Sequence, residues 1–209
     1  MKVSRTFGQV LMVLSAMMMA LVGCASTRAS KFYMLESLSG SRGVERLEAF
    51  DSAISVGLGP VSLPEYHDRP QIVTRTNENT VQLAEFDRWA GALSSSVSRI
   101  LAENLTFLLN TDSVLQYPWP AAFDVTYQVL VDVYRFDGIL GDKAVLDAQW
   151  SIVGKKGRKV LLLKKSTFVV PAGGPSFESL VSAQSRTLGD LSREIALALE
   201  KLGQDRAHD

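Results

Sequence analysis

Cysteine and histidine are the residue types best able to carry covalent, acid–base or metal chemistry, and this sequence holds few of them. The single cysteine is Cys24, and the histidines are His67, between Tyr66 and Asp68, and His208 near the C-terminus. The sequence has no C-x-x-C or H-x-x-x-H spacing for a metal, no G-x-S-x-G elbow for a nucleophile and no lysine-bearing glycine loop for a phosphate. These absences argue against an enzyme and against a cofactor. We expect His67 to be a loop side chain in water, and a hydrolase that pairs it with a distant serine stays open as an alternative.

The position of Cys24 indicates a different role for the thiol. Two basic residues, Lys2 and Arg5, precede an almost wholly apolar run over residues 10–22, which is the order of a signal peptide. The run is shorter than the roughly 20 residues that a bilayer-spanning helix needs. A small residue, Gly23, stands directly before the cysteine, and this "LVGC" ending resembles the bacterial lipobox. We therefore expect residues 1–23 to be removed as a signal peptide.

The lipobox resemblance implies that Cys24 carries thioether-linked diacylglycerol and that an acyl chain such as palmitate is added to the new amino terminus. Each buried methylene contributes about 0.8 kcal/mol and one acyl chain alone binds a membrane only marginally, so two or three chains are needed for firm attachment. Residue 25 is Ala where Asp acts as an inner-membrane retention signal in many lipoproteins. The expected location is the outer membrane, lipid-anchored and facing the periplasm.

Composition narrows the class of partner. Removing residues 1–23 leaves 20 basic and 22 acidic residues, a net charge of −2 with histidine neutral, and no long basic run remains. Nucleic acid is therefore an unsuitable partner. A lipidated cysteine leaves no thiol for a disulfide, so the fold depends on its core. We expect a lipidated tether at 24–30, a single periplasmic domain at 31–202 and a frayed tail at 203–209.

The first half of the domain carries strand signals. Residues 31–37 and 53–64 are rich in β-branched and aromatic residues, and the second of these segments ends at a proline. Residues 71–76 and 80–86 flank a short Asn-rich turn, which predicts a hairpin.

Apolar spacing in the second half predicts a helix, three strands and a second helix. From Asp87 to Leu108, apolar residues recur every three or four positions, with Trp89 on the stripe and Asp87 as N-cap. Residues 124–136 alternate, 144–154 and 159–170 are joined by a "GKKGR" turn, and 176–202 return to helical spacing through Gly189. The pattern predicts an α+β fold with two layers: a mixed, largely antiparallel sheet with two amphipathic helices packed on one face.

Two runs are more specific than the rest: "GPVSLPEYHDRPQIV" at Gly59–Val73 and "EFDRWAGAL" at Glu85–Leu93. With the early "FYML" at Phe32–Leu35, they resemble the ABC-type transport auxiliary lipoprotein family, the paraquat-inducible intermembrane-transport lipoproteins. The sequence departs from that pattern at His67, where an apolar residue is commoner, and at Gly91, which falls inside the predicted first helix.

The resemblance implies a non-catalytic subunit of an intermembrane lipid-transport system. Such a subunit docks a mammalian-cell-entry-type conduit protein to the outer membrane and supports envelope integrity; a homo-oligomer, such as a ring around the conduit, would suit that role. Prolines 64 and 70 bound a loop that could present Tyr66 and Arg69 to the partner, and Trp119, between two prolines, is a third candidate. The competing interpretation has Arg69 paired with a neighbouring acid and Tyr66 capping the core. An independent lipid-binding carrier is a further alternative function.

Overall fold

Two β-sheets and two long helices make up the part of the chain that the computed structural model describes, which is residue 12 and residues 28–40, 43–47, 51, 54–154 and 159–207. Cys24, His208 and the predicted turn at 155–158 lie outside those residues. In chain order the elements are β1 Lys31–Tyr33, the 3-10 helix η1 Leu38–Gly40, β2 Val56–Ser62, β3 Gln71–Asn77, β4 Thr80–Trp89, α2 Leu93–Leu109, β5 Val114–Gln116, β6 Tyr127–Ile139, β7 Lys143–Gly154, β8 Lys159–Pro171 and α3 Phe177–Ala207.

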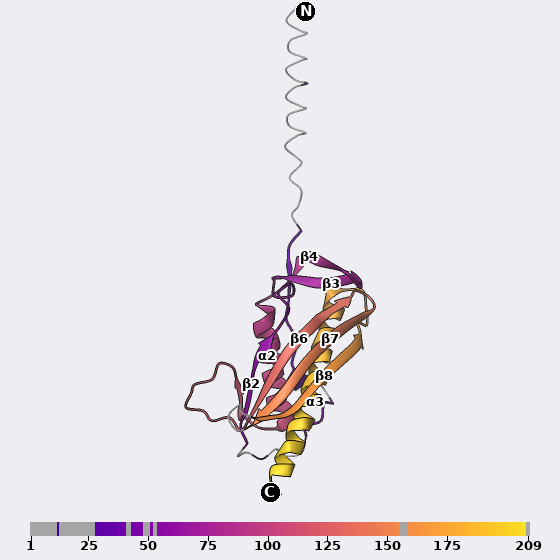
Figure 1. The fold of residues 1–209 in the computed structure, drawn as a ribbon. Helices are drawn as coiled ribbons and strands as arrows, with labels where there is room; N and C mark the ends of the chain where they lie inside the picture. The colour runs from indigo at the N-terminus through magenta and orange to yellow at the C-terminus, as the bar shows by residue number, and fades with distance from the viewer. Residues whose placement is uncertain are drawn as a thin grey trace, which may run out of the picture.

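The larger sheet has five strands in the order β5-β2-β6-β7-β8. The strands β6, β7 and β8 pair antiparallel as successive hairpins, whereas β2 runs parallel to both β5 and β6. Helices α2 and α3 lie side by side against one face of this sheet (Figure 1). Their apolar stripes meet the inward side chains of the strands, and the innermost of these include Leu101, Leu105, Val129, Trp150 and Leu191.

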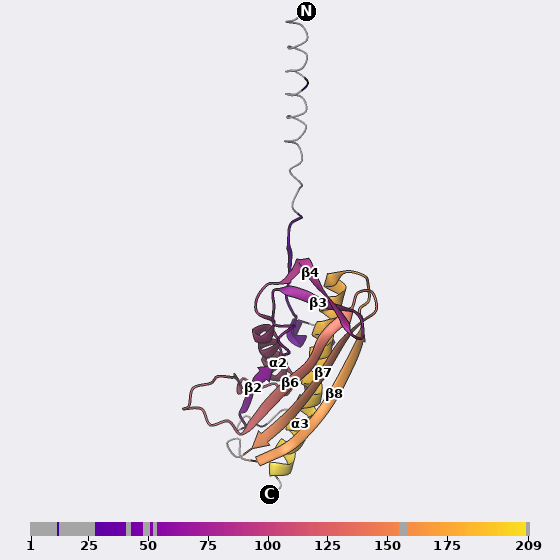
Figure 2. The ribbon, with the colours of Figure 1, turned by 45° about the horizontal axis from the view of Figure 1, so that its top comes forward.

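A second, smaller sheet with the order β1-β4-β3 covers one end of the larger sheet (Figures 1 and 2). The α+β class and the two helices on one face are confirmed, but the strands form two sheets where the sequence predicts one. The separation begins at the loop between β2 and β3, which contains Pro64 and Pro70. Because proline has no N–H to donate to a ladder, the chain leaves the larger sheet there and starts a new one.

The predicted start of the first helix is wrong. The chain stays in strand β4 through Asp87 and Trp89, and α2 begins only at Leu93. The Asp87 carboxylate faces inward, where it accepts a hydrogen bond of 2.7 Å from the Tyr33 hydroxyl on β1, and burial together with this carboxylate raises the pKa of Tyr33 to about 12. Gly91 falls in the exposed bend before α2, so it costs the helix nothing.

Helix α3 runs the length of the domain. At its start the Phe177 ring lies 6.4 Å from that of Tyr33, and towards its end the Leu202 carbonyl accepts a 3.0 Å hydrogen bond from the Tyr127 hydroxyl. Gly189 lets η1 approach closely, because a Cβ there would lie 2.8 Å from Cδ2 of Leu38. The helix continues to Ala207, beyond the predicted boundary at 202, so the predicted tail begins as helix. Within the described residues, no helix has the length and apolar character needed to cross a membrane.

Candidate docking site

The two specific sequence runs, Gly59–Val73 and Glu85–Leu93, meet in space beside the loop at residues 64–70. The Trp89 N–H, at the end of β4, donates a 2.7 Å hydrogen bond to the carbonyl of Pro70, at the end of the loop. The adjoining residue Gln71 pairs with Arg88 across the β3–β4 ladder. The loop and the segment that leads into α2 therefore form one continuous surface.

Short-range hydrogen bonds fold the loop into consecutive turns. The N–H groups of His67 and Asp68 donate to the carbonyls of Pro64 and Glu65, at 2.9 and 3.2 Å. The Asp68 carboxylate extends to α2, where Oδ1 accepts a 3.0 Å hydrogen bond from the Ser94 hydroxyl and a 3.4 Å bond from its N–H. Asp68 thus places a negative charge at the start of a helix, where the helix dipole favours it. Residue 92 itself supplies no side-chain cap.

His67 holds the loop down on the larger sheet. Its side chain is 1 % exposed, which corrects the expectation of a solvated loop histidine. Nε2 accepts a hydrogen bond of 3.4 Å from the Phe136 N–H on β6, and the ring lies 4.1 Å from that of Tyr66. A ring nitrogen that accepts from a backbone N–H is not available to activate a serine, so the contacts of His67 indicate a structural role.

Beneath His67 lies a buried ion cluster that sequence analysis missed. Asp137 of β6 is fully buried; its carboxylate accepts hydrogen bonds of 2.9 Å from Arg75 Nε and 2.7 Å from Arg135 Nε, and it lies 3.9 Å from Nε2 of His67. The hydrogen bond to Asp137 raises the pKa of Arg75. Because Arg75 belongs to β3, the cluster links the small sheet to the large one and supports the loop from below. The sequence gives no clear signal for this cluster, because β6 also carries Gln128, Asp132 and Arg135.

Tyr66 and Arg69 are both half-buried, and the Tyr66 side chain lies against the His67 ring and interacts with Arg75 of the ion cluster. Among the described residues no ion pair joins Arg69 to Glu65 or Asp68, and its buried Nε has no hydrogen-bond partner there. Arg69 lines a pocket of about 360 Å³ together with Asp68, Pro70, Trp89 and residues 90–92. Within the described residues, the competing interpretation of Arg69 as the partner of a neighbouring acid is therefore not supported, and Arg69 lines an open pocket.

Trp119 is not part of this surface. Its ring covers Gly57 of β2, where a Cβ would lie 2.5 Å from the ring, and it packs edge-on against Tyr117 at 5.7 Å. Gly57 pairs with Gln128 near the start of β6, whereas His67 contacts Phe136 near the end of that strand. Eight residues of strand separate the two positions, or about 26 Å. The structure thus brings Tyr66 and Arg69 together and leaves Trp119, half-buried, at the other end of the sheet.

The buried imidazole predicts a specific loss of stability in acid. Burial, with smaller contributions from the arginines, lowers the pKa of His67 to about 4, although Asp137 acts in the opposite direction. The pKa of His67 is about 6.5 in the unfolded chain and lower in the folded protein. The buried neutral imidazole is therefore fully compatible with folding at a pH above 6.5, and stability is lost as the pH falls towards 4. We expect this single group to cost about 2 kcal/mol of unfolding free energy between pH 7 and pH 5.

Urea denaturation at pH 7 and pH 5 tests this expectation against His67→Gln, whose amide oxygen can accept the same Phe136 N–H but does not titrate. The difference between the two pH values should be about 2 kcal/mol smaller in the variant. Equal acid sensitivity of the two proteins would show that His67 does not titrate in this way.

The fold and the site define an α+β domain whose buried polar groups brace an exposed loop. In the described part of the chain no three His, Cys, Asp or Glu side chains are grouped as metal ligands would be. The chain belongs to the ABC-type transport auxiliary lipoprotein component family, whose sequence model matches residues 37–196. This is a family of transport accessory proteins and not a family of enzymes.

Two solved structures show the same fold. A crystal structure of a protein from Xanthomonas campestris, assigned to the DUF330 family, has a TM-score of 0.70 and 15 % identity over 86 % of this chain and 100 % of that one. A crystal structure of an uncharacterised protein has a TM-score of 0.67 and 16 % identity over 82 % of this chain and 99 % of that one. No curated protein matches the chain significantly. At these identities the two structures establish the fold alone.

Proposed function

We propose that the chain is an outer-membrane lipoprotein subunit of an intermembrane lipid-transport system, where it docks a conduit protein of the mammalian-cell-entry type and supports envelope integrity. Membership of the transport auxiliary lipoprotein family supports this role, because an auxiliary component requires a transporter with which to work. The sequence before the domain supports the anchor, with a basic start, an apolar run and "LVGC" ending at Cys24.

The proposal has a membrane side and a partner side. On the membrane side, Cys24 carries the lipid and Ala25 allows transfer to the outer membrane, so the domain faces the periplasm. On the partner side, Tyr66 and Arg69 contact the conduit, and several copies of the chain surround it as a homo-oligomer. Trp119 lies too far from the loop to share one small contact with it, so we propose it as a separate contact.

The observation that carries the docking role is the construction of the loop at residues 64–70. His67 fixes it to β6 and Asp68 fixes it to α2, so the loop loses little conformational entropy when it binds. The open pocket beside Arg69 provides a concave site for a partner side chain. Tyr and Arg are residue types enriched at interfaces.

Alanine substitution of Tyr66 or Arg69 should weaken the complex with the conduit partner by about 1–2 kcal/mol, as truncation of an anchor residue does. The measurement is recovery of the partner with the affinity-purified lipoprotein after mild crosslinking in the envelope, followed by affinity measurement on the purified pair. Glu65→Ala is the matched control, because Glu65 is exposed on the same loop and lines no part of the pocket. It should bind as the unmodified protein does.

Melting temperatures of the same three variants separate docking from a structural role. If Tyr66 and Arg69 only stabilise the loop, both variants should melt lower and bind with unchanged affinity while folded. That outcome would remove the loop from the interface. Recovery of bound phospholipid in place of any protein partner would favour the carrier alternative.

A further inference from the structure

The described chain enters the domain at Arg28, at the end that carries the small sheet (Figures 1 and 2). Arg28, the first described residue of the tether, is four residues after Cys24, and four extended residues span at most about 14 Å. Any lipid on Cys24 must therefore lie within about that distance of Arg28. The opposite end of the molecule carries the C-terminal part of α3 (Figures 1 and 2).

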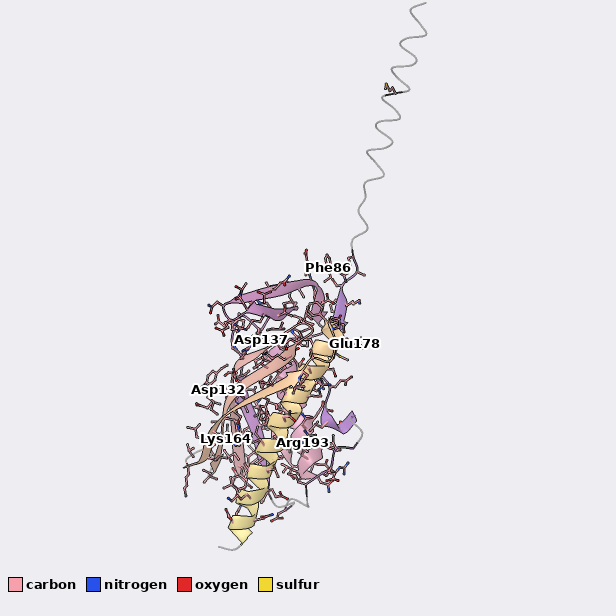
Figure 3. The ribbon with its side chains drawn as sticks, turned by 90° about the vertical axis from the view of Figure 1, so that its right-hand side faces the viewer. Phe86, Asp132, Asp137, Lys164, Glu178 and Arg193 are labelled. Carbon is pink, nitrogen blue, oxygen red and sulfur yellow. The ribbon has the colours of Figure 1, made fainter. Side chains whose placement is uncertain are left out.

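The outer side of the small sheet at this end carries two aromatic and two basic side chains, Arg28, Phe32, Phe86 and Arg88, which we call the anchor surface. Phe32 pairs with Arg88 across the parallel β1–β4 ladder, so both side chains point to the same side. The Arg28 guanidinium lies over the Phe86 ring, 5.9 Å from its centre. Figure 3 shows Phe86 at the end of the molecule where the tether enters.

Burial separates this side of the sheet from its inner side. On the inner side, Tyr33, Asp87 and Trp89 are wholly or partly buried, and the Asp87 carboxylate is occupied by the Tyr33 hydroxyl. On the outer side, Phe32 is 66 % exposed and Arg28 is exposed, whereas Phe86 and Arg88 are half-buried. Among the described residues, Phe32 belongs to neither hydrophobic core cluster.

The chemistry of the anchor surface suits the boundary between headgroups and acyl chains of a phospholipid layer. Aromatic rings enter the upper acyl region, while guanidinium groups remain at the level of the phosphates and pair with them. Glu85, on the same strand, offsets part of the positive charge. Attraction between this surface and the membrane therefore depends on individual arginine–phosphate pairs and on the aromatic rings, and not on a large net charge. With lipid on Cys24, the short tether would keep this surface close to the membrane.

We propose that the anchor surface rests on the phospholipid layer to which Cys24 is attached, as a second membrane contact that fixes the orientation of the domain. This inference depends on lipid attachment at Cys24, which belongs to the proposed function. The occupant is the membrane itself, because four residues hold a lipidated Cys24 within about 14 Å of Arg28 on this surface.

A single reporter in the full-length lipidated protein tests the proposal. Cys24 is the only native cysteine, and acylation blocks its thiol, so Phe32→Cys can be labelled selectively with an environment-sensitive fluorophore. The protein is reconstituted into phosphatidylethanolamine–phosphatidylglycerol vesicles that contain a nitroxide lipid with the spin label near the headgroup. Leu163→Cys is the matched control, since Leu163 is 62 % exposed on β8, eight residues from the end of that strand at Pro171.

The nitroxide should quench the fluorophore at position 32 severalfold more strongly than the one at position 163. Arg28→Glu in the labelled protein should reduce that quenching by at least half, because the reversed charge repels phosphate, whereas Lys201→Glu near the other end of α3 should leave it unchanged. Equally weak quenching at both positions, in vesicles that carry the protein on flotation, would overturn the proposal. A protein that fails to float would instead contradict lipid attachment and the proposed function.

Discussion

Replacing Cys24 with Ser should abolish acyl labelling and leave an uncleaved precursor. A serine hydroxyl has no sulfur with which to form the thioether bond to diacylglycerol. In the pathway that the lipobox resemblance implies, cleavage between Gly23 and residue 24 follows this lipid transfer. The lost attachment energy is large, since each buried methylene of two or three acyl chains contributes about 0.8 kcal/mol. Palmitate labelling, the mass of the purified chain and membrane fractionation measure the effect.

Ser26→Ala is the control for this experiment, because it changes a hydroxyl residue two positions away and leaves the "LVGC" run intact. That variant should be labelled, cleaved and found in the outer membrane as the unmodified protein is. Normal labelling of the Cys24→Ser protein would exclude Cys24 as the lipid site. Predominant inner-membrane fractionation of the unmodified protein would contradict the proposed location.

Replacing Asp137 with Ala should lower the free energy of unfolding by about 3 kcal/mol, the range for removing one partner of a buried ion pair. The carboxylate is fully buried and neutralises Arg75 and Arg135, whose side chains are only 16 % and 29 % exposed. Without it, two cations and the His67 ring face one another across a cavity. Urea denaturation at pH 7 measures the loss.

Asp132→Ala provides the matched control on the same strand (Figure 3). Asp132 is exposed and accepts one hydrogen bond, of 2.7 Å, from the Ser62 hydroxyl, so its loss should cost no more than about 1 kcal/mol. Asp137→Asn keeps the shape and removes the charge, and it should fall between the two. Similar losses at positions 132 and 137 would show that the cluster does not stabilise the fold.

Local periodicity was sufficient to predict most of the elements. The alternation around Val129 and the helical spacing around Leu101 and Leu191 each place apolar side chains on one side of an element, and those sides form the core. The start of α2 was misassigned because Trp89 and Leu93 are four residues apart, a spacing that also fits one side of a helix. The competing strand pairing with β1 lies more than 50 residues away, and local spacing carries no information about it.

The candidate site was only partly accessible from sequence for the same reason. Proline positions indicated a rigid loop with Tyr66 and Arg69 on it, whereas its supports come from distant segments: β6 beneath His67 and α2 beside Asp68. His67 was expected in water because its neighbours in sequence are polar. Its burial depends on Phe136 and Asp137, about 70 residues further along the chain.

The length of α3 sets a stand-off distance for the domain. A helix of 31 residues is roughly 46 Å long, and α3 starts beside β1 and ends at the far side of the larger sheet. If the anchor surface rests on lipid, the loop that carries Tyr66 lies close to the membrane, whereas Trp119 lies well into the periplasm. A conduit arriving from the inner membrane would meet Trp119 first and reach Tyr66 only where its own end approaches the lipid.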